Sequence, residues 1–198
     1  MPNKNGTRAR KAIAAGAMPP LAEVLRNRRI LITGGTGFLG KVLLSILLRE
    51  HPEIGQIQLL IRGDQRSSLL RFRNEILDSP ALTQVREQLG AQFDRHVEKK
   101  VTIVPGDISE PGLIGADANI DPGSIDAVIH CAGLVNFEAS LEKAIAINTT
   151  GVANVIEFCR AHDAALIHIS TCYVAGIADG QRFEDDGAVD WCPNGRRN

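Results

Sequence analysis

Three glycines at intervals of three residues constrain the fold of this chain more than any other feature. Gly34, Gly37 and Gly40 follow a short apolar stretch, Arg29–Thr33, and open a stretch with helical periodicity, Phe38–Glu50. In such a strand–turn–helix unit the glycines allow a tight turn, close approach of a pyrophosphate, and close packing of helix on strand. Free N–H groups at the start of the helix then face the phosphates. This glycine turn predicts a dinucleotide site formed by Thr33, Gly34, Thr36, Gly37, Phe38, Leu39 and Gly40.

Strands and helices alternate along the rest of the chain. Further apolar strands are expected at Gln56–Ile61, Val101–Pro105, Asp126–Cys131 and Ala165–Ser170. Helices are expected at Leu21–Leu25, Ser67–Asp78, Thr83–Phe93 and Ala139–His162. This alternation predicts an α/β fold of the Rossmann type, with a doubly wound parallel sheet.

The two ends of the chain lack this pattern. We expect residues 1–19 to be a flexible tail, and residues 20–198 to be a Rossmann domain that is incomplete at its C-terminal end. The apolar pattern fades after Ser170, so the part that would bind a substrate is expected to lie outside this sequence.

Charge and cysteine content narrow the partners. A net charge of −1 gives no reason to expect nucleic-acid binding, which needs a clustered basic surface. No apolar run is long enough to span a bilayer. The cysteines show neither a C-x-x-C pair nor a zinc-ligand spacing, which indicates free thiols, no metal and a reducing, cytoplasmic location. They are Cys131, Cys159, Cys172 and Cys192.

The end of the second expected strand distinguishes the two nicotinamide cofactors. Enzymes that use NAD usually carry Asp or Glu about 20 residues after the glycines, to hold the ribose hydroxyls. Here Arg62 stands 22 residues after Gly40, and a guanidinium suits a 2′-phosphate. Asp64 weakens this interpretation, and Arg62 is otherwise an exposed loop arginine. The pattern favours NADPH.

The next two strand ends carry small or acidic residues. Asp107 and Ile108 follow the third strand, where an Asp can reach an adenine edge. Cys131, Ala132 and Gly133 end the fourth strand, and small residues there let a cofactor approach the sheet. The alternative is a pair of ordinary strand-ending turns.

Asn148 stands within an apolar stripe of the last expected helix. It follows Leu141 by seven residues, and the stripe continues through Val152 and Val155. A buried amide needs hydrogen-bond partners. We therefore expect Asn148 to support the backbone of a site rather than to act in catalysis.

Several stretches together resemble the extended short-chain dehydrogenases/reductases and, more closely, the fatty acyl-CoA reductases with a male-sterility-type NAD(P)-binding domain. The resemblance covers about residues 20–180. The stretches are Ile32–Lys41, His51–Gly55 leading into Leu59–Arg62, Gly106–Pro111, Val135–Phe137, Asn148–Gly151 and His168–Val174.

This resemblance implies NADPH-dependent reduction of a long-chain acyl-CoA or acyl-carrier thioester to an aldehyde or fatty alcohol, in lipid metabolism. It makes Thr171, with Ser170 as second choice, the hydroxyl that stabilises the reacting oxygen. The alternative is a strand-end pair bonded to its own backbone. The family's Tyr-x-x-x-Lys pair is missing from this sequence, because Ile177 stands four residues after Tyr173. Any peripheral membrane association is expected only through parts outside this sequence.

Two other functions stay open. One is a different extended reductase-like enzyme, such as a nucleotide-sugar epimerase or dehydratase, although Arg62 argues against it. The other is a non-catalytic module that binds NADPH.

Overall fold

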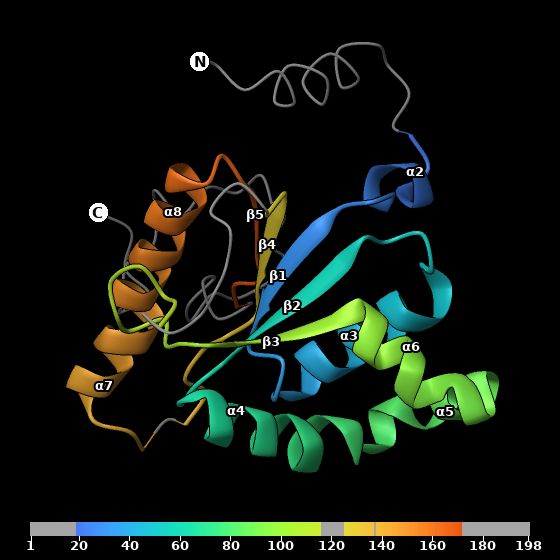
Figure 1. The fold of residues 1–198 in the computed structure, drawn as a ribbon. Helices are drawn as coiled ribbons and strands as arrows, with labels where there is room; N and C mark the ends of the chain where they lie inside the picture. Colours follow the sequence, from blue (N-terminus) through green and yellow to red (C-terminus); the bar gives the residue numbers. More distant parts are fainter. Residues whose placement is uncertain (1–18, 116–124, 137, 172–198) are drawn as a thin grey trace, which may run out of the picture. The chain divides into compact units, whose positions relative to one another are not determined.

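Five parallel strands form the centre of the fold (Figure 1). Their order in the sheet is β3-β2-β1-β4-β5, so the direction of winding reverses between β1 and β4. This arrangement confirms the predicted doubly wound α/β fold. The strands are β1 (Arg29–Thr33), β2 (Gln56–Ile61), β3 (Val101–Pro105), β4 (Ala127–His130) and β5 (Ala165–His168).

A computed structural model describes residues 19–115, 125–136 and 138–171. The chain forms one compact unit up to His168, and a second unit begins at Ile169. The predicted flexible tail lies outside the described residues except for Pro19. Within the described ranges, no helix combines the length and apolar character needed to cross a bilayer.

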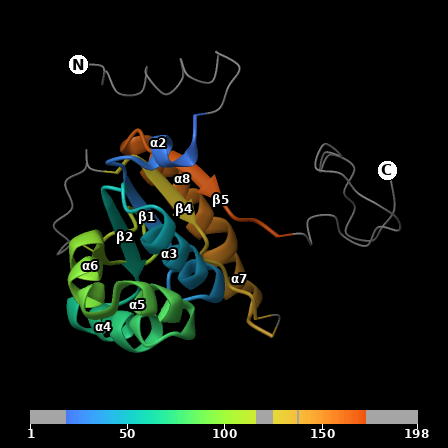
Figure 2. The ribbon, with the colours of Figure 1, turned by 90° about the vertical axis from the view of Figure 1, so that its right-hand side faces the viewer.

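Helices cover both faces of the sheet (Figures 1 and 2). Ile30 and Ile32 of β1 point into a core shared with α3 (Phe38–Glu50), while Leu31 points into a second core shared with α8 (Gly151–Ala161). Successive residues of a strand face opposite sides, so a strand covered on both faces is apolar throughout. A short helix, α2 (Leu21–Leu25), precedes the sheet as predicted.

The segment between β2 and β3 contains one more helix than predicted. Two helices were expected, ending at Phe93, but α6 (Phe93–Lys100) follows. Only Phe93 and Val97 of α6 are buried. A single pair of apolar residues four positions apart is too little periodicity to predict a helix from the sequence. The elements before it are α4 (Gln65–Arg71), the π-helical η1 (Phe72–Leu77), η2 (Pro80–Leu82), α5 (Thr83–Leu89) and η3 (Gly90–Gln92).

The helix predicted at Ala139–His162 is divided by a π-helical turn. It consists of α7 (Leu141–Ile145), η5 (Ala146–Thr150) and α8. The predicted apolar stripe is wrong for the first of these, because Leu141 is 74% exposed and Ile145 47%. The wide turn of η5 rotates α7 relative to α8, so residues seven apart do not share one face.

Candidate functional site

A pocket of about 240 Å³ opens at the carboxyl ends of the central strands. Ligands of doubly wound sheets bind at this edge, beside the point where the winding reverses. Its volume is below the ~300–1,000 Å³ of sites that enclose a drug-sized ligand, so these residues have room for only part of a dinucleotide. The predicted residues that line this strand-end pocket are Thr33, Gly34, Thr36, Gly37, Arg62, Asp107, Ile108, Cys131, Ala132 and Gly133.

The glycine turn leaves no room for side chains on the protein side. Gly34 has φ +73°, and a Cβ there would lie 2.6 Å from the backbone nitrogen of Ala132. A Cβ on Gly40 would lie 2.3 Å from the carbonyl oxygen of Gly34. Gly37 is different, because the only close neighbour of a Cβ there, within the described part of the chain, would be that same oxygen, at 3.2 Å. Gly34 and Gly40 therefore shape the turn, while Gly37 leaves space on the pocket side.

The start of α3 fits a phosphate group. Gly37 is the N-cap, and a glycine has no side chain with which to cap this end of the helix. The first N–H groups of a helix have no partner within it, and together with the helix dipole they attract anions. The residues present therefore fit the pyrophosphate of a dinucleotide.

Three of the predicted turn residues do not line the strand-end pocket. Phe38 is 83% exposed, Leu39 is also exposed, and Gly40 is buried against the turn. Phe38 and Leu39 would serve a phosphate only through their backbone N–H groups. Their role in cofactor binding stays a prediction.

Thr33 and His130 connect β1 to β4 below the pocket. Thr33 Oγ1 lies 2.6 Å from His130 Nδ1, and it also accepts a hydrogen bond from the backbone N–H of Ala132 at 3.2 Å. We assign the Thr33 hydroxyl as donor to Nδ1, because this arrangement uses both functions of the hydroxyl. Both side chains are fully buried. This Thr33–His130 rung holds the two strands together where their loops diverge.

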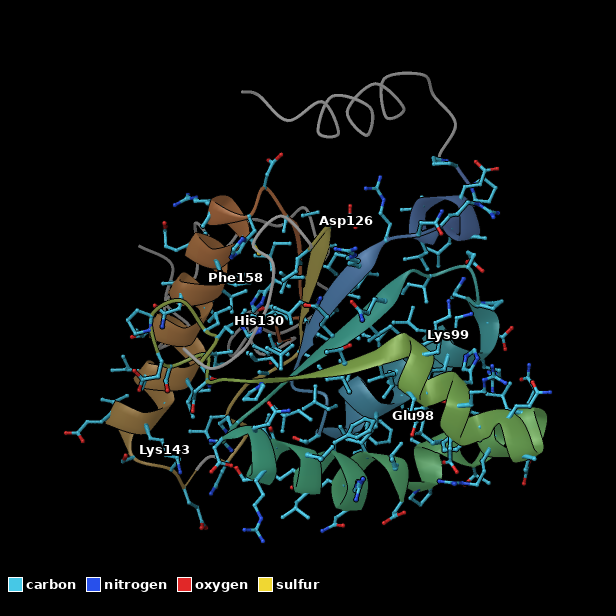
Figure 3. All side chains as sticks on the ribbon, in the orientation of Figure 1. Glu98, Lys99, Asp126, His130, Lys143 and Phe158 are labelled. Carbon is cyan, nitrogen blue, oxygen red and sulfur yellow. The ribbon has the colours of Figure 1, made fainter. Side chains whose placement is uncertain are left out.

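The pKa of His130 is lowered to about 4, mainly by burial and to a smaller extent by the nearby charge of His168. The two rings lie 5.0 Å apart, between their centroids. His130 is therefore neutral at neutral pH. Figure 3 shows its place inside the fold. Burial also raises the pKa of the Cys131 thiol in the next position, which keeps that thiol protonated.

Asp64, the acidic residue near Arg62 that would favour NAD, is engaged in capping a helix. Asp64 is the N-cap of α4, where its Oδ1 accepts hydrogen bonds from the Ser67 backbone N–H at 2.7 Å and the Ser67 hydroxyl at 2.6 Å. These bonds lower the pKa of Asp64. Arg62 lines the pocket, and within the described ranges no hydrogen bond or ion pair involves its guanidinium. The doubt raised by Asp64 in the sequence is therefore weaker in the structure.

Asp107 begins a loop that is fixed at several points. Its Oδ1 accepts hydrogen bonds from the backbone N–H and the hydroxyl of Ser109, at 2.9 and 2.8 Å. Its own N–H donates to the carbonyl of Leu113, a buried residue with φ +63°. Asn154 of α8 donates to the carbonyl of Ile108 at 2.9 Å. One edge of the Asp107 carboxylate thus shapes the loop, and the rest can face a ligand.

Asn148 supports the backbone beside the site, as predicted, but it is not buried. The expected burial is wrong, because Asn148 is exposed on the π-helical turn η5. Its Oδ1 accepts from the backbone N–H of Leu134 at 2.7 Å, and its Nδ2 donates to the Leu134 carbonyl at 3.0 Å. Asn148 does not line the pocket itself, but it holds the loop after β4, which does.

Sequence reasoning missed two cations among the lining residues. Arg71 ends α4 and Lys143 lies on α7 (Figure 3). Neither follows a strand, so no strand-end pattern could reveal them. The spacing of Arg71 and Glu75, four residues apart, was the available signal for the first. The other lining residues missed are Leu60, Ile61, Gly106, Leu134 and Ile147.

The predicted catalytic hydroxyls lie outside the unit that holds the pocket. Ser170 and Thr171 come two and three residues after the end of β5, in the unit that begins at Ile169. Their role stays a prediction, and Tyr173 lies outside the described residues. In the described part of the chain, no group of His, Cys, Asp and Glu side chains could hold a metal ion.

The family described as male sterility protein, an NAD-binding domain, matches residues 32–188. The chain belongs to this family. The match includes the glycine turn, Arg62 and all the strand ends that form the pocket. The domain is therefore one that binds a nicotinamide dinucleotide, as the glycine turn predicts.

Similar proteins confirm the predicted resemblance. An alcohol-forming fatty acyl-CoA reductase of Simmondsia chinensis is 34% identical over 90% of this chain, and fatty acyl-CoA reductase 1 of Arabidopsis thaliana is 34% identical over 82%. This chain spans 38% of the first relative and 34% of the second.

Solved structures agree with the fold. The terminal R domain of the myxalamid pathway superimposes with a TM-score of 0.64 and 26% identity, covering 81% of this chain and 39% of that domain. An ADP-L-glycero-D-manno-heptose-6-epimerase of Helicobacter pylori has a TM-score of 0.55 at 21% identity, covering 82% of this chain and 45% of the epimerase. The second likeness concerns the fold alone.

Proposed function

We propose that this chain is the cofactor-binding part of an NADPH-dependent reductase that acts on a long-chain fatty acyl-CoA or acyl-carrier thioester. The observation that carries the cofactor choice is the guanidinium of Arg62 at the strand-end pocket, with Asp64 engaged as a helix cap. The choice of substrate rests on the relatives, which are fatty acyl-CoA reductases. The free thiols of Cys131 and Cys159 fit the reducing, cytoplasmic setting that we propose.

In this proposal each group at the pocket has one task. The N–H groups at the start of α3 bind the pyrophosphate, Arg62 pairs with the 2′-phosphate, and Asp107 faces the adenine. The bound cofactor supplies the hydride that reduces the thioester carbonyl. The hydroxyl of Thr171, or of Ser170, stabilises the negative charge that develops on the carbonyl oxygen.

Replacement of Arg62 tests the cofactor choice. Arg62→Ala is expected to weaken NADPH binding by about tenfold to a hundredfold, since a hydrogen bond to a charged group contributes ~1.5–3 kcal/mol. NADH lacks the 2′-phosphate, so its affinity should change little. Titration of both cofactors against both proteins by calorimetry measures this. Equal affinity of the unmodified protein for NADPH and NADH would refute the role of Arg62.

Measurement of turnover tests whether this chain binds the cofactor without catalysing the reduction. With no lysine four residues after Tyr173, this sequence lacks the proton donor implied by its family, and loss of a general acid reduces a rate ~10²- to 10⁴-fold. We expect the chain to bind NADPH yet to oxidise it negligibly with a long-chain acyl-CoA. The fluorescence of NADPH reports both binding and oxidation. A rate near that of a full-length relative would contradict the expectation.

A further inference from the structure

We propose that Arg71, held by Glu75, is a positioning residue that braces the glycine turn against the end of β2 and leaves Arg62 as the arginine for the phosphate. The proposal rests on the proposed function, in which the glycine turn binds the cofactor. Two arginines at one phosphate site would ordinarily both be assigned to the phosphate. The contacts of their side chains separate the two roles.

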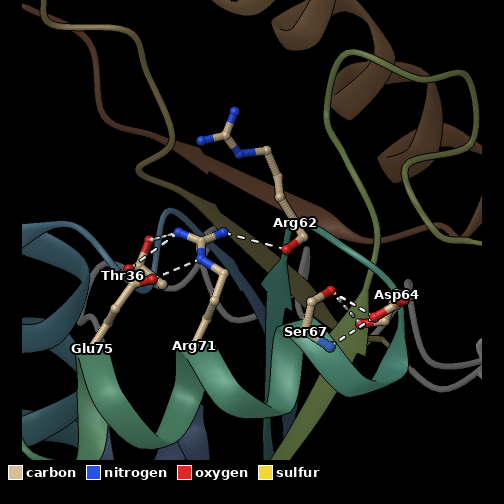
Figure 4. Close-up of polar contacts among 6 residues, drawn as sticks. All are labelled: Thr36, Arg62, Asp64, Ser67, Arg71 and Glu75. Atoms are coloured by element: carbon tan, nitrogen blue, oxygen red, sulfur yellow. Dashed lines mark hydrogen bonds and ion pairs between the residues drawn. The ribbon is translucent and has the colours of Figure 1, made fainter.

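The guanidinium of Arg71 connects three segments that are distant in sequence (Figure 4). Its Nη2 donates to the hydroxyl of Thr36 in the glycine turn at 3.4 Å, and its Nη1 donates to the carbonyl of Arg62 after β2 at 3.3 Å. The remaining bonds go to Glu75 on η1. Arg71 therefore fixes the spacing between the turn and the loop that carries Arg62.

Glu75 occupies the edge of Arg71 that is best suited to an anion. Nε donates to Oε1 at 2.8 Å and Nη2 donates to Oε2 at 3.1 Å, which is the two-pronged geometry in which arginine also binds phosphate. The bonds from Arg71 lower the pKa of Glu75, so the carboxylate stays charged at neutral pH. With four hydrogen bonds made, a single N–H of the Arg71 guanidinium remains available.

Arg62 has the opposite environment. Its carbonyl receives a bond from Arg71, but its guanidinium points away from Arg71 and takes part in none of the drawn interactions (Figure 4). The side chain is exposed at the pocket and free to follow a ligand. Arg62 therefore suits a group that only NADPH carries, whereas Arg71 shapes the turn that both cofactors would use.

The two roles predict different patterns of affinity. Arg71→Met removes the brace and keeps a side chain of similar length. It should weaken NADPH and NADH binding alike, by about three- to tenfold, because the glycine turn is then less ordered in the free protein and ordering it reduces the affinity for either cofactor. The ratio of the two dissociation constants should stay within about twofold of its original value. Glu75→Gln should cause a smaller loss of affinity for both cofactors and should leave the ratio of their dissociation constants unchanged, although Glu75 does not line the pocket.

A matched control separates bracing from net charge. Arg73→Met makes the same change in charge two residues further along, at an exposed side chain with no hydrogen bond or ion pair to the described residues. We expect it to leave both dissociation constants unchanged. Arg71→Lys keeps the charge but cannot make the two-pronged pair, so it should resemble Arg71→Met rather than the unmodified protein.

Calorimetric titration of NADPH and NADH against these variants decides the proposal, with thermal melting to confirm that each is folded. A loss confined to NADPH in Arg71→Met would overturn the brace and make Arg71 a phosphate ligand. Unchanged affinities in Arg71→Met would also overturn it. If Arg62→Ala fails to alter the NADPH-to-NADH ratio while Arg71→Met weakens both, the brace stands and the cofactor choice of the proposed function fails. Absence of binding to the unmodified protein would refute both.

Discussion

Gly40→Ala is expected to lower the free energy of unfolding by about 3 kcal/mol, near the upper end of overpacking penalties. Its methyl carbon would lie 2.3 Å from the carbonyl oxygen of Gly34 and 2.8 Å from the Cα of Gly35. Both are backbone atoms, so the glycine turn itself must shift, and α3 with it. Denaturation in urea measures the change.

Two other glycines provide the comparison. Gly115→Ala should change stability by less than about 0.5 kcal/mol, since among the described residues its Cβ would meet only the Pro105 carbonyl oxygen, at 3.6 Å. Gly37→Ala should affect stability less than Gly40→Ala but weaken cofactor binding by at least about tenfold, by blocking a charge-assisted N–H contact to phosphate. Unchanged stability of Gly40→Ala would show that the helix does not need this close approach.

Acidification from about pH 6.5 to 4 is expected to remove about 3 kcal/mol of stability through His130 alone. The pKa of His130 is lowered from 6.5 to about 4, and each pKa unit corresponds to ~1.4 kcal/mol. Because the folded-state pKa of this base is the lower one, the unfolded state takes up the proton first. The contribution is therefore complete above the unfolded pKa and is lost as the pH falls toward the folded pKa. Urea denaturation at a series of pH values measures the slope.

His130→Asn should abolish most of this slope while keeping a polar partner for Thr33. His96 needs its own control, because burial, followed by the nearby charges of Lys100 and Lys99, lowers its pKa as well. His96→Asn should remove only its own share of the pH dependence. The carboxylates with lowered pKa, Glu75 among them, begin to lose their contribution as the pH falls below the usual pKa of a carboxyl group, and the loss is complete below their folded-state pKa, so they overlap only the acidic end of this range. An unchanged slope in His130→Asn would refute the assignment.

The strand ends could be predicted because local sequence determines them. An apolar run followed by glycine, aspartate or small residues identifies where β1, β3 and β4 end, and parallel strands bring those ends to one edge of the sheet. The sequence therefore predicted Gly34, Asp107 and Ala132 as cofactor-binding residues. The structure brings all three to one pocket, while their role in binding stays a prediction.

The residues that were missed depend on helix geometry over longer distances. Arg71 returns to the pocket only because α4 runs back past the turn, and the rotation of Asn148 depends on a π-helical turn that leaves no sign in the pattern of apolar residues. The helix at Phe93–Lys100 was missed because its buried face consists of two residues. The periodicity of apolar residues reveals a helix only where its buried face is broad and apolar. Arg71 and Asn148 are polar, and the buried face of the helix at Phe93–Lys100 is narrow.

The setting of Arg62 separates two kinds of evolutionary change in this domain. Its side chain is exposed, and its guanidinium makes no hydrogen bond or ion pair with the described residues, so its replacement should leave folding almost untouched. In contrast, Gly34 and Gly40 of the glycine turn lie close against backbone atoms, and the Thr33–His130 rung is fully buried. A lineage could therefore change its preferred nicotinamide cofactor by single, nearly neutral substitutions after β2, while the turn that holds either cofactor could not drift without loss of the fold.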